Sequence, residues 1–297
     1  MRHFFHKLFF GLSVLMVAPS IAQAHGDCHS HSGPSIAEWV DDLALAMANM
    51  TVSAEDRANI RAAGGEPYGY MDGLGWVRTD FYAVTVTLPE NLNPRDLLDM
   101  IRDDPNGLGQ KRLKHHVGWP ASVGKNGRKK YEIVNLKITG NNGAISYVDV
   151  DTSDGDFTAF TVKNKASGSH PVSGARTWGF NKLTSGRYIF WTTAIESANI
   201  WLTGGIGAKM QDGTWKALVR DIGDEVQQRG GQAHNIYVDD EWQNGGLKPG
   251  RVKAEDLDSS DGIDQVLSIK KLEAAEERAR QALKRQAEKS WWSQPKF

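Results

Sequence analysis

The sequence predicts an α+β protein in which an antiparallel sheet of about five or more strands packs against one amphipathic helix. Three observations predict this fold. Apolar and polar residues alternate in a series of short segments, as they do in strands with one buried face. Asn-Gly and Asp-Gly pairs between these segments are typical of hairpin turns. After them, one stretch has apolar residues at helical spacing and ends at Gly230–Gly231, where glycine can adopt the left-handed cap conformation.

Local signals justify the other elements in order. Ser53, with Asp56 three residues later, resembles a capping box and begins a helix. Pro94 follows Asn93 and occupies the first position of another helix. The turn Thr184-Ser185-Gly186 joins the last two strands of the series. The expected helices cover 36–47, 53–63, 94–104 and 214–229, and the expected strands cover 76–88, 131–139, 144–150, 157–164, 175–183, 187–195 and 234–238.

The last hairpin of the series and the helix after it carry the candidate binding residues. Aromatic side chains alternate on each strand of the hairpin, so they share one face of the sheet. The helix presents a single apolar stripe, made of Trp215, Leu218, Val219, Ile222 and Val226, and Lys216 falls on its opposite face. The stripe is expected to bury itself on the aromatic hairpin. The candidate ligand-binding residues are therefore Trp178, Phe180, Tyr188, Phe190 and Trp215.

The order of elements between Tyr131 and Gly231 resembles the START-like helix-grip architecture. The resemblance covers about a third of the chain and is carried by the element order, without a diagnostic motif. Such domains bind apolar ligands in a cavity between the sheet and the long helix. The resemblance therefore implies a non-catalytic protein that binds a hydrophobic small molecule or lipid between its sheet and helix.

The first 24 residues are expected to be a signal peptide. Arg2 and Lys7 form a basic start, 8–17 is an apolar run, and Ala22-Gln23-Ala24 is a small-x-small cleavage site. The apolar run is shorter than the roughly 20 residues that a membrane-spanning helix needs. The sequence therefore predicts a periplasmic or secreted protein with no transmembrane segment after the signal is removed.

Composition restricts the classes of partner. Signal removal takes away two of the 35 basic residues and none of the 36 acidic residues, so the mature chain carries a formal charge of −3. This balance argues against nucleic acid as a partner. The single cysteine allows no intramolecular disulfide. The chain has no G-x-S-x-G elbow, P-loop or H-E-x-x-H helix, and nothing in it dictates an enzyme.

The segment 25–35 is expected to form a flexible His-rich arm. Four of its side chains are good ligands for copper, zinc or nickel, namely His25, Cys28, His29 and His31. Cleavage after Ala24 would give His25 a free α-amine beside its imidazole. That pair resembles half of the histidine brace of copper-dependent lytic polysaccharide monooxygenases, although only His25 matches their pattern. Metal binding, with copper or zinc as cofactor, is therefore an alternative function, and the plain interpretation is a solvated arm.

The predicted domain organisation follows composition along the chain. It consists of the signal peptide 1–24, the arm 25–35, an α+β domain 36–238, an acidic Gly-rich linker 239–264 and a charged helical tail 265–297. The tail has a thin apolar stripe, which is typical of a solvated helix. A second alternative function is an envelope protein-protein interaction in which the helix 270–292 binds a partner.

Two charged residues, Arg176 and Glu196, lie in or next to the predicted aromatic hairpin. Arg176 lies on the first strand of the aromatic hairpin and is interpreted as surface, although it also has the position to point into a ligand cavity. Glu196 interrupts an apolar region. Carboxylates suggest acid–base chemistry only when their separation is known.

Overall fold

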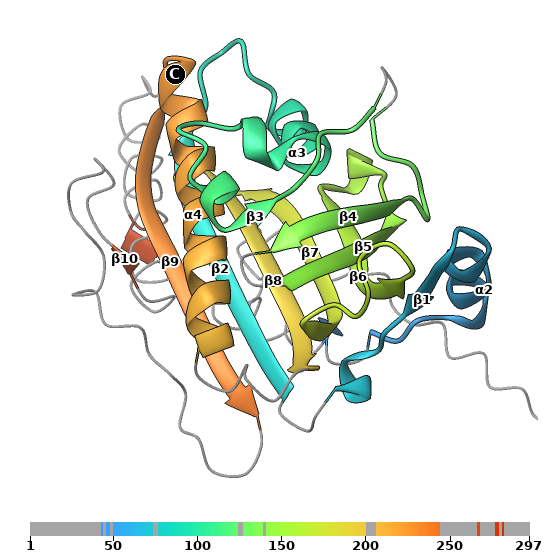
Figure 1. The fold of residues 1–297 in the computed structure, drawn as a ribbon. Helices are drawn as coiled ribbons and strands as arrows, with labels where there is room; N and C mark the ends of the chain where they lie inside the picture. Colours follow the sequence, from blue (N-terminus) through green and yellow to red (C-terminus); the bar gives the residue numbers. More distant parts are fainter. Residues whose placement is uncertain are drawn as a thin grey trace, which may run out of the picture.

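The computed structural model describes residues 50–73, 77–123, 127–138, 141–199 and 206–243, the pair 266–267 and six isolated residues. Figure 1 shows a large curved sheet with a long helix lying across one of its faces. Leu43, Ala46 and Met47 are the described residues of the expected helix 36–47, and all three are helical. None of the described helices is long and apolar enough to cross a membrane.

The sheet contains ten strands. Nine follow the order β10-β9-β2-β8-β7-β6-β5-β4-β3, and β1 pairs with β6. All neighbours are antiparallel except β9 and β10. The α+β fold and its antiparallel sheet are confirmed. The strands are β1 (Gly65–Pro67), β2 (Val77–Thr87), β3 (Val117–Gly118), β4 (Ile133–Ile138), β5 (Asn141–Asp149), β6 (Asp156–Asn164), β7 (Val172–Lys182), β8 (Tyr188–Ala198), β9 (Gln232–Gln243) and β10 (Val266–Leu267), and the helices are α2 (Ala54–Ala62), α3 (Pro94–Asp103) and α4 (Ile206–Gln228).

The helix starts follow the local signals in the sequence. The Ser53 hydroxyl accepts a hydrogen bond from the backbone N–H of Asp56 (3.0 Å) and donates to its carboxylate (2.7 Å). The Asn93 side chain caps α3 by accepting from the N–H of Arg95 (2.8 Å), and Pro94 is the first helical residue. Both side chains satisfy N–H groups that have no partner within the helix, which explains why the starts were predictable.

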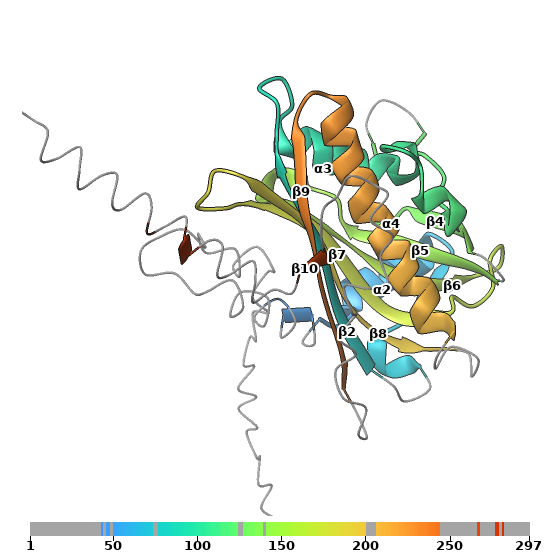
Figure 2. The same cartoon turned by 90° about the vertical axis from the view of Figure 1, so that its left-hand side faces the viewer.

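The main core lies between the sheet and α4, as Figure 2 shows from a second side. Most of the predicted apolar stripe is buried there, and Trp215 is partly buried against the same cluster. The buried stripe residues are Leu218, Val219, Ile222 and Val226. The prediction that this stripe packs on the sheet is therefore confirmed.

Several predicted boundaries differ from the structure. The long helix begins at Ile206, not near Asp212 or Thr214, so it includes Gly213. A helical glycine costs only about 1 kcal/mol relative to alanine, less than burial of the stripe contributes. The predicted turn at Asn141–Gly143 belongs to β5, where it pairs with Leu136–Ile138 of β4.

The strand at the end of the domain is longer than the sequence pattern predicts. β9 continues from the predicted end at Val238 through the acidic residues to Gln243, into the segment predicted as linker. Antiparallel pairing with β2 supplies hydrogen-bond partners along this whole length, whatever the side-chain pattern. Val266–Leu267, at the start of the predicted tail, forms β10 beside Ile236–Tyr237.

The outer side of α4 is covered by residues 105–118, here named the α4 strap. Its backbone N–H groups at Gly109 and Leu113 donate to Glu225 (3.0 Å) and Asp221 (2.8 Å) of the helix. The guanidinium of Arg112 in the strap pairs with Asp224. Gly109 has φ +50°, and a Cβ there would lie 2.4 Å from the carbonyl oxygen of Asp221, so this close approach requires glycine. The helix is thus buried on two sides.

Candidate functional site

The face of the sheet that α4 covers divides into a charged part and an aromatic part. The pairing of β2, β8 and β7 sets this division. Arg78 of β2 lies opposite Glu196 of β8. Ala194 of β8 has Asp80 of β2 on one side and Arg176 of β7 on the other. Further along the same strands, Trp178 lies opposite Thr192 and Phe180 opposite Phe190. Because alternate residues share a face, the charged residues continue directly into the aromatic ones.

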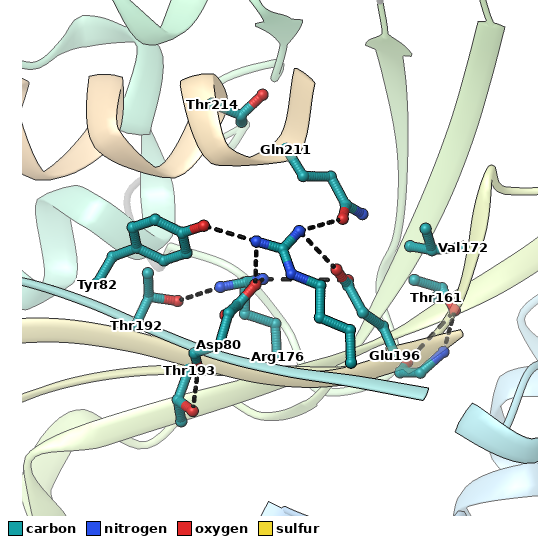
Figure 3. Close-up of polar contacts among 12 residues, drawn as sticks. Asp80, Tyr82, Thr161, Val172, Arg176, Thr192, Thr193, Glu196, Gln211 and Thr214 are labelled. Carbon is teal, nitrogen blue, oxygen red and sulfur yellow. Dashed lines mark hydrogen bonds and ion pairs between the residues drawn. The ribbon is translucent and has the colours of Figure 1, made fainter. Parts of the chain in front are cut away.

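Arg78 links the sheet to the start of α4. Figure 3 labels its contact residues, namely Asp80, Tyr82, Glu196 and Gln211. Its guanidinium donates to the Gln211 side chain of the helix (2.9 Å) and to the Tyr82 hydroxyl (2.7 Å). It also lies 3.8 Å from a carboxylate oxygen of Asp80 and 3.8 Å from one of Glu196. Since all four contacts come from a buried side chain, Arg78 fixes the helix end over this part of the sheet.

Arg176 makes a short ion pair across the sheet. Its Nη2 donates to the Asp80 carboxylate at 2.6 Å, and its Nη1 donates to the Thr192 hydroxyl at 3.3 Å. The guanidinium carbon also lies 3.8 Å from the ring centroid of Trp215, a cation–π contact with α4. Arg176 is only 6% exposed, so its interpretation as surface is wrong. The surface placement of Lys216 is also wrong: it is 6% exposed and pairs with Asp212 at 2.5 Å.

The charged residues at this end of the site form a cluster, here named the buried polar cluster. Among the described residues, it holds as many positive as negative charges. Three cations and three anions are joined by ion pairs of 4.0 Å or less. They are Arg78, Arg176, Lys216, Asp80, Glu196 and Asp212. Two polar atoms at the cluster nevertheless have no hydrogen-bond partner among the described residues, namely Oδ1 of Asp80 and Nε1 of Trp215. Such orphaned buried groups are costly and therefore indicate a missing partner.

The five predicted ligand-binding residues lie on the same side of the sheet. Phe180 contacts Phe190 and Tyr188, with ring centroids 5.5 and 6.2 Å apart. Trp178 contacts Trp215 of α4 edge-on at 6.1 Å. Trp178 and Phe190 are buried, whereas Phe180, Tyr188 and Trp215 are only partly buried. The structure therefore brings all five together between sheet and helix. Their role in binding stays a prediction.

The sequence argument missed Arg78 and Asp80. Their signal is the pattern Arg78-x-Asp80-x-Tyr82, which places three polar residues on one face of a strand. The next two residues on that face, Val84 and Val86, are apolar. A strand with one solvated end has the same pattern, so the sequence alone does not distinguish the two cases.

The metal-binding arm stays a prediction. His25, Cys28, His29 and His31 lie outside the described residues. Within the part of the chain that the structure describes, no three His, Cys, Asp or Glu side chains gather as a metal site.

His170 lies outside the aromatic and polar parts of the site. Its Nδ1 lies 3.0 Å from the carbonyl oxygen of Val172 and 3.2 Å from the backbone nitrogen of the same residue, and a Cβ on Gly143 would lie 2.4 Å from its ring. Burial lowers the pKa of His170 to about 4, because the protonated imidazole loses its hydration. His170 is therefore neutral in the folded protein near neutral pH.

This shift makes stability depend on pH. The unfolded chain binds a proton at His170 below about pH 6.5, and the folded chain does so only near pH 4, so stability is lost as pH falls through this window. The loss is about 3 kcal/mol by pH 4. We expect the stability of His170→Asn, measured by urea unfolding, to fall less steeply between pH 7.5 and pH 4, because asparagine does not titrate. If the unfolding free energies of the two proteins fall equally with pH, the lowered pKa of His170 is not the cause of the fall.

Comparisons with known proteins found likenesses only among solved structures. No protein-family model matches the chain, and no curated protein matches it in sequence. A hypothetical protein from Helicobacter pylori is 16% identical over 50% of this chain and 86% of its own, with a TM-score of 0.36. A conserved protein from Geobacillus kaustophilus is 10% identical over 52% of this chain and 98% of its own (TM-score 0.33). A norcoclaurine synthase point mutant from Thalictrum flavum is 10% identical over 53% and 99% (TM-score 0.35).

Proposed function

We propose that this chain is an exported, non-catalytic protein that binds a hydrophobic small molecule or lipid between its sheet and α4. The observation that supports the proposal most is the convergence of the aromatic residues on the α4-facing side of the sheet. Ligand sites are lined mainly by apolar and aromatic side chains, with a few polar groups that orient the ligand. The aromatic residues and the adjoining buried polar cluster supply both kinds of group.

Phe180, Tyr188 and Trp215 form the accessible side of the proposed site. They are only partly buried, whereas Trp178 beneath them is buried against Phe157, with ring centroids 4.9 Å apart. A ligand that replaces the water at these three rings gains roughly 25 cal/mol for each Å² of apolar surface removed from solvent. The buried Trp178 provides the base of the site.

Native mass spectrometry of the protein purified from its own compartment tests this function directly. We expect a mass adduct that organic extraction removes, and the same spectra report the cleavage site after Ala24. The extracted protein should then bind the neutral apolar probe N-phenyl-1-naphthylamine, with an increase in probe fluorescence. Absence of both an adduct and probe binding would overturn the proposed function.

Two substitutions separate the site from the rest of the surface. Phe180→Ala removes a partly buried ring of the proposed site and should weaken probe binding by about tenfold, since an aromatic contact is worth more than 1 kcal/mol. Val123→Ala changes an apolar residue that is 96% exposed and should leave probe binding unchanged. If the two variants bind the probe with equal affinity, the probe binds outside the proposed site.

Metal binding by the N-terminal arm is the second candidate, and it is favoured by the spacing of His25, Cys28, His29 and His31. Mature protein beginning at His25 should bind Cu(II) through the α-amine and the imidazole. Its affinity should fall as pH drops, because both ligands must lose their protons. Titration followed by the copper d–d absorption band measures this.

One added residue before His25 moves the amine away from the imidazole and should weaken copper binding sharply. Replacing His29 and His31 together by Ala tests whether the rest of the arm takes part. If the extended chain binds copper as well as the native one, the terminal amine is not a ligand. If neither binds better than an unrelated His-containing peptide, the arm is only solvated.

A further inference from the structure

We propose that the ligand carries a neutral hydroxyl group, which donates a hydrogen bond to Asp80 and accepts one from Trp215. This inference rests on the proposed function, because it names the chemistry of the ligand in the same site. It depends on three observations: two orphaned polar atoms, a shared neighbour between them, and the charge balance around them.

The orphaned atoms are one acceptor and one donor. Asp80 is 4% exposed, and its Oδ2 is engaged by Arg176 at 2.6 Å, yet its Oδ1 has no hydrogen-bond partner among the described residues. The indole N–H of Trp215 is likewise buried without one. A hydroxyl has one donor hydrogen and two acceptor lone pairs, so it offers a partner of the right kind to each of these two atoms.

The two groups are neighbours through Arg176. Its guanidinium is hydrogen-bonded to the Asp80 carboxylate and stacks 3.8 Å from the centroid of the Trp215 ring. Trp215 also contacts Trp178, at the boundary between the charged and aromatic parts of the face. A ligand with its apolar body on the aromatic rings therefore presents its polar end to Asp80 and Trp215.

The balanced charges around Asp80 and Trp215 favour a ligand whose polar group is neutral. Within the described residues, the three cations of the polar cluster are already paired with its three anions. A carboxylate or phosphate on the ligand would bring an uncompensated negative charge beside the Asp80 carboxylate, in surroundings where burying a charge costs several kcal/mol. An ammonium would lie beside Arg176 with the same cost. A neutral hydroxyl adds no charge and gains two hydrogen bonds.

Four probes test the inference on the full mature chain. Three are naphthalenes that differ only in the substituent at position 2: 2-naphthol has the hydroxyl, 2-methylnaphthalene lacks it, and 2-naphthoate carries a negative charge. N-phenyl-1-naphthylamine reports on apolar binding as such. We expect 2-naphthol to bind at least about tenfold more tightly than either relative, because the other two leave the buried atoms unpaired or bury a charge. Titration calorimetry or fluorescence measures the affinities.

Matched tryptophan variants locate the hydroxyl. Trp215→Phe keeps an aromatic ring but removes the N–H, and it should reduce the preference for 2-naphthol over 2-methylnaphthalene. Trp191→Phe makes the same change on the opposite face of the sheet, where the indole donates to Asn181 (2.8 Å), and should leave the preference intact. Asp80→Asn is a second test of the acceptor. The two tryptophan variants keep the ion pairs, so the inference does not depend on whether Asp80→Asn folds.

The possible outcomes distinguish failure of the hydroxyl inference from failure of the proposed function. Equal affinities for 2-naphthol and 2-methylnaphthalene, or the tightest binding by 2-naphthoate, would overturn the hydroxyl but leave apolar binding in place. If N-phenyl-1-naphthylamine binds but none of the three 2-substituted naphthalenes does, the hydroxyl inference is also overturned, since the hydroxyl then contributes no affinity. If Trp215→Phe and Trp191→Phe behave alike, Trp215 does not hold the hydroxyl. If no probe binds, the proposed function fails as well.

Discussion

Val219→Asp should abolish the cooperative unfolding transition of the domain, or lower its unfolding free energy by more than about 4 kcal/mol. Val219 is fully buried (0% exposed) on the stripe of α4 that packs on the sheet. The substitution removes apolar contacts and places a carboxylate among apolar side chains, where no cation pairs with it. Circular dichroism during urea unfolding measures the effect, and tryptophan fluorescence reports whether the core around α4 is still formed.

The control must be an exposed residue of the same helix. Lys216 does not qualify, because it is buried and ion-paired. Gln227 near the end of α4 is exposed, and Gln227→Asp should change stability by no more than about 0.5 kcal/mol. Equal urea midpoints for Val219→Asp and Gln227→Asp would show that the stripe does not carry the packing of α4.

The parts of the fold that the sequence predicted are those whose signals are local. Capping by Ser53 and Asn93 needs only a few consecutive residues, and both helix starts are confirmed. The alternation of aromatic residues in β7 and β8 likewise defines a face without knowledge of the partner strand. What a face packs against depends on the rest of the chain. No local signal in α4 indicates what covers its outer side, because the strap that covers it comes from a segment about a hundred residues earlier.

The polar part of the site could not be predicted for the same reason. Arg176 and Asp80 are 96 residues apart in the chain, and their ion pair forms because β8 pairs with β2 on one side and with β7 on the other. Each residue by itself is typical of a solvated surface. The aromatic residues were recognisable because burial of a large ring is favourable with almost any neighbour, whereas burial of a charge is favourable only with a particular partner.

Asp80→Ala should destabilise the domain by about 3 to 5 kcal/mol, the cost of leaving a buried charge without its partner. Arg176 loses its 2.6 Å partner, and Arg78 loses one of its two carboxylates. Glu196 remains, but at 4.0 Å from Arg176 it compensates only in part. Urea unfolding at pH 7 measures the loss.

A double-mutant cycle distinguishes this ion pair from simple loss of volume. Asp80→Leu and Arg176→Met each leave one charge of the pair buried, so each should destabilise strongly, whereas the double variant removes both charges and keeps apolar volume. We expect the double variant to be more stable than the sum of the single effects predicts, by at least about 1.5 kcal/mol, because replacing both members of a buried pair by apolar groups is often neutral. If the single effects simply add, Asp80 and Arg176 are not coupled. The charged part of the α4-facing surface would then consist of independently solvated groups instead of one buried cluster.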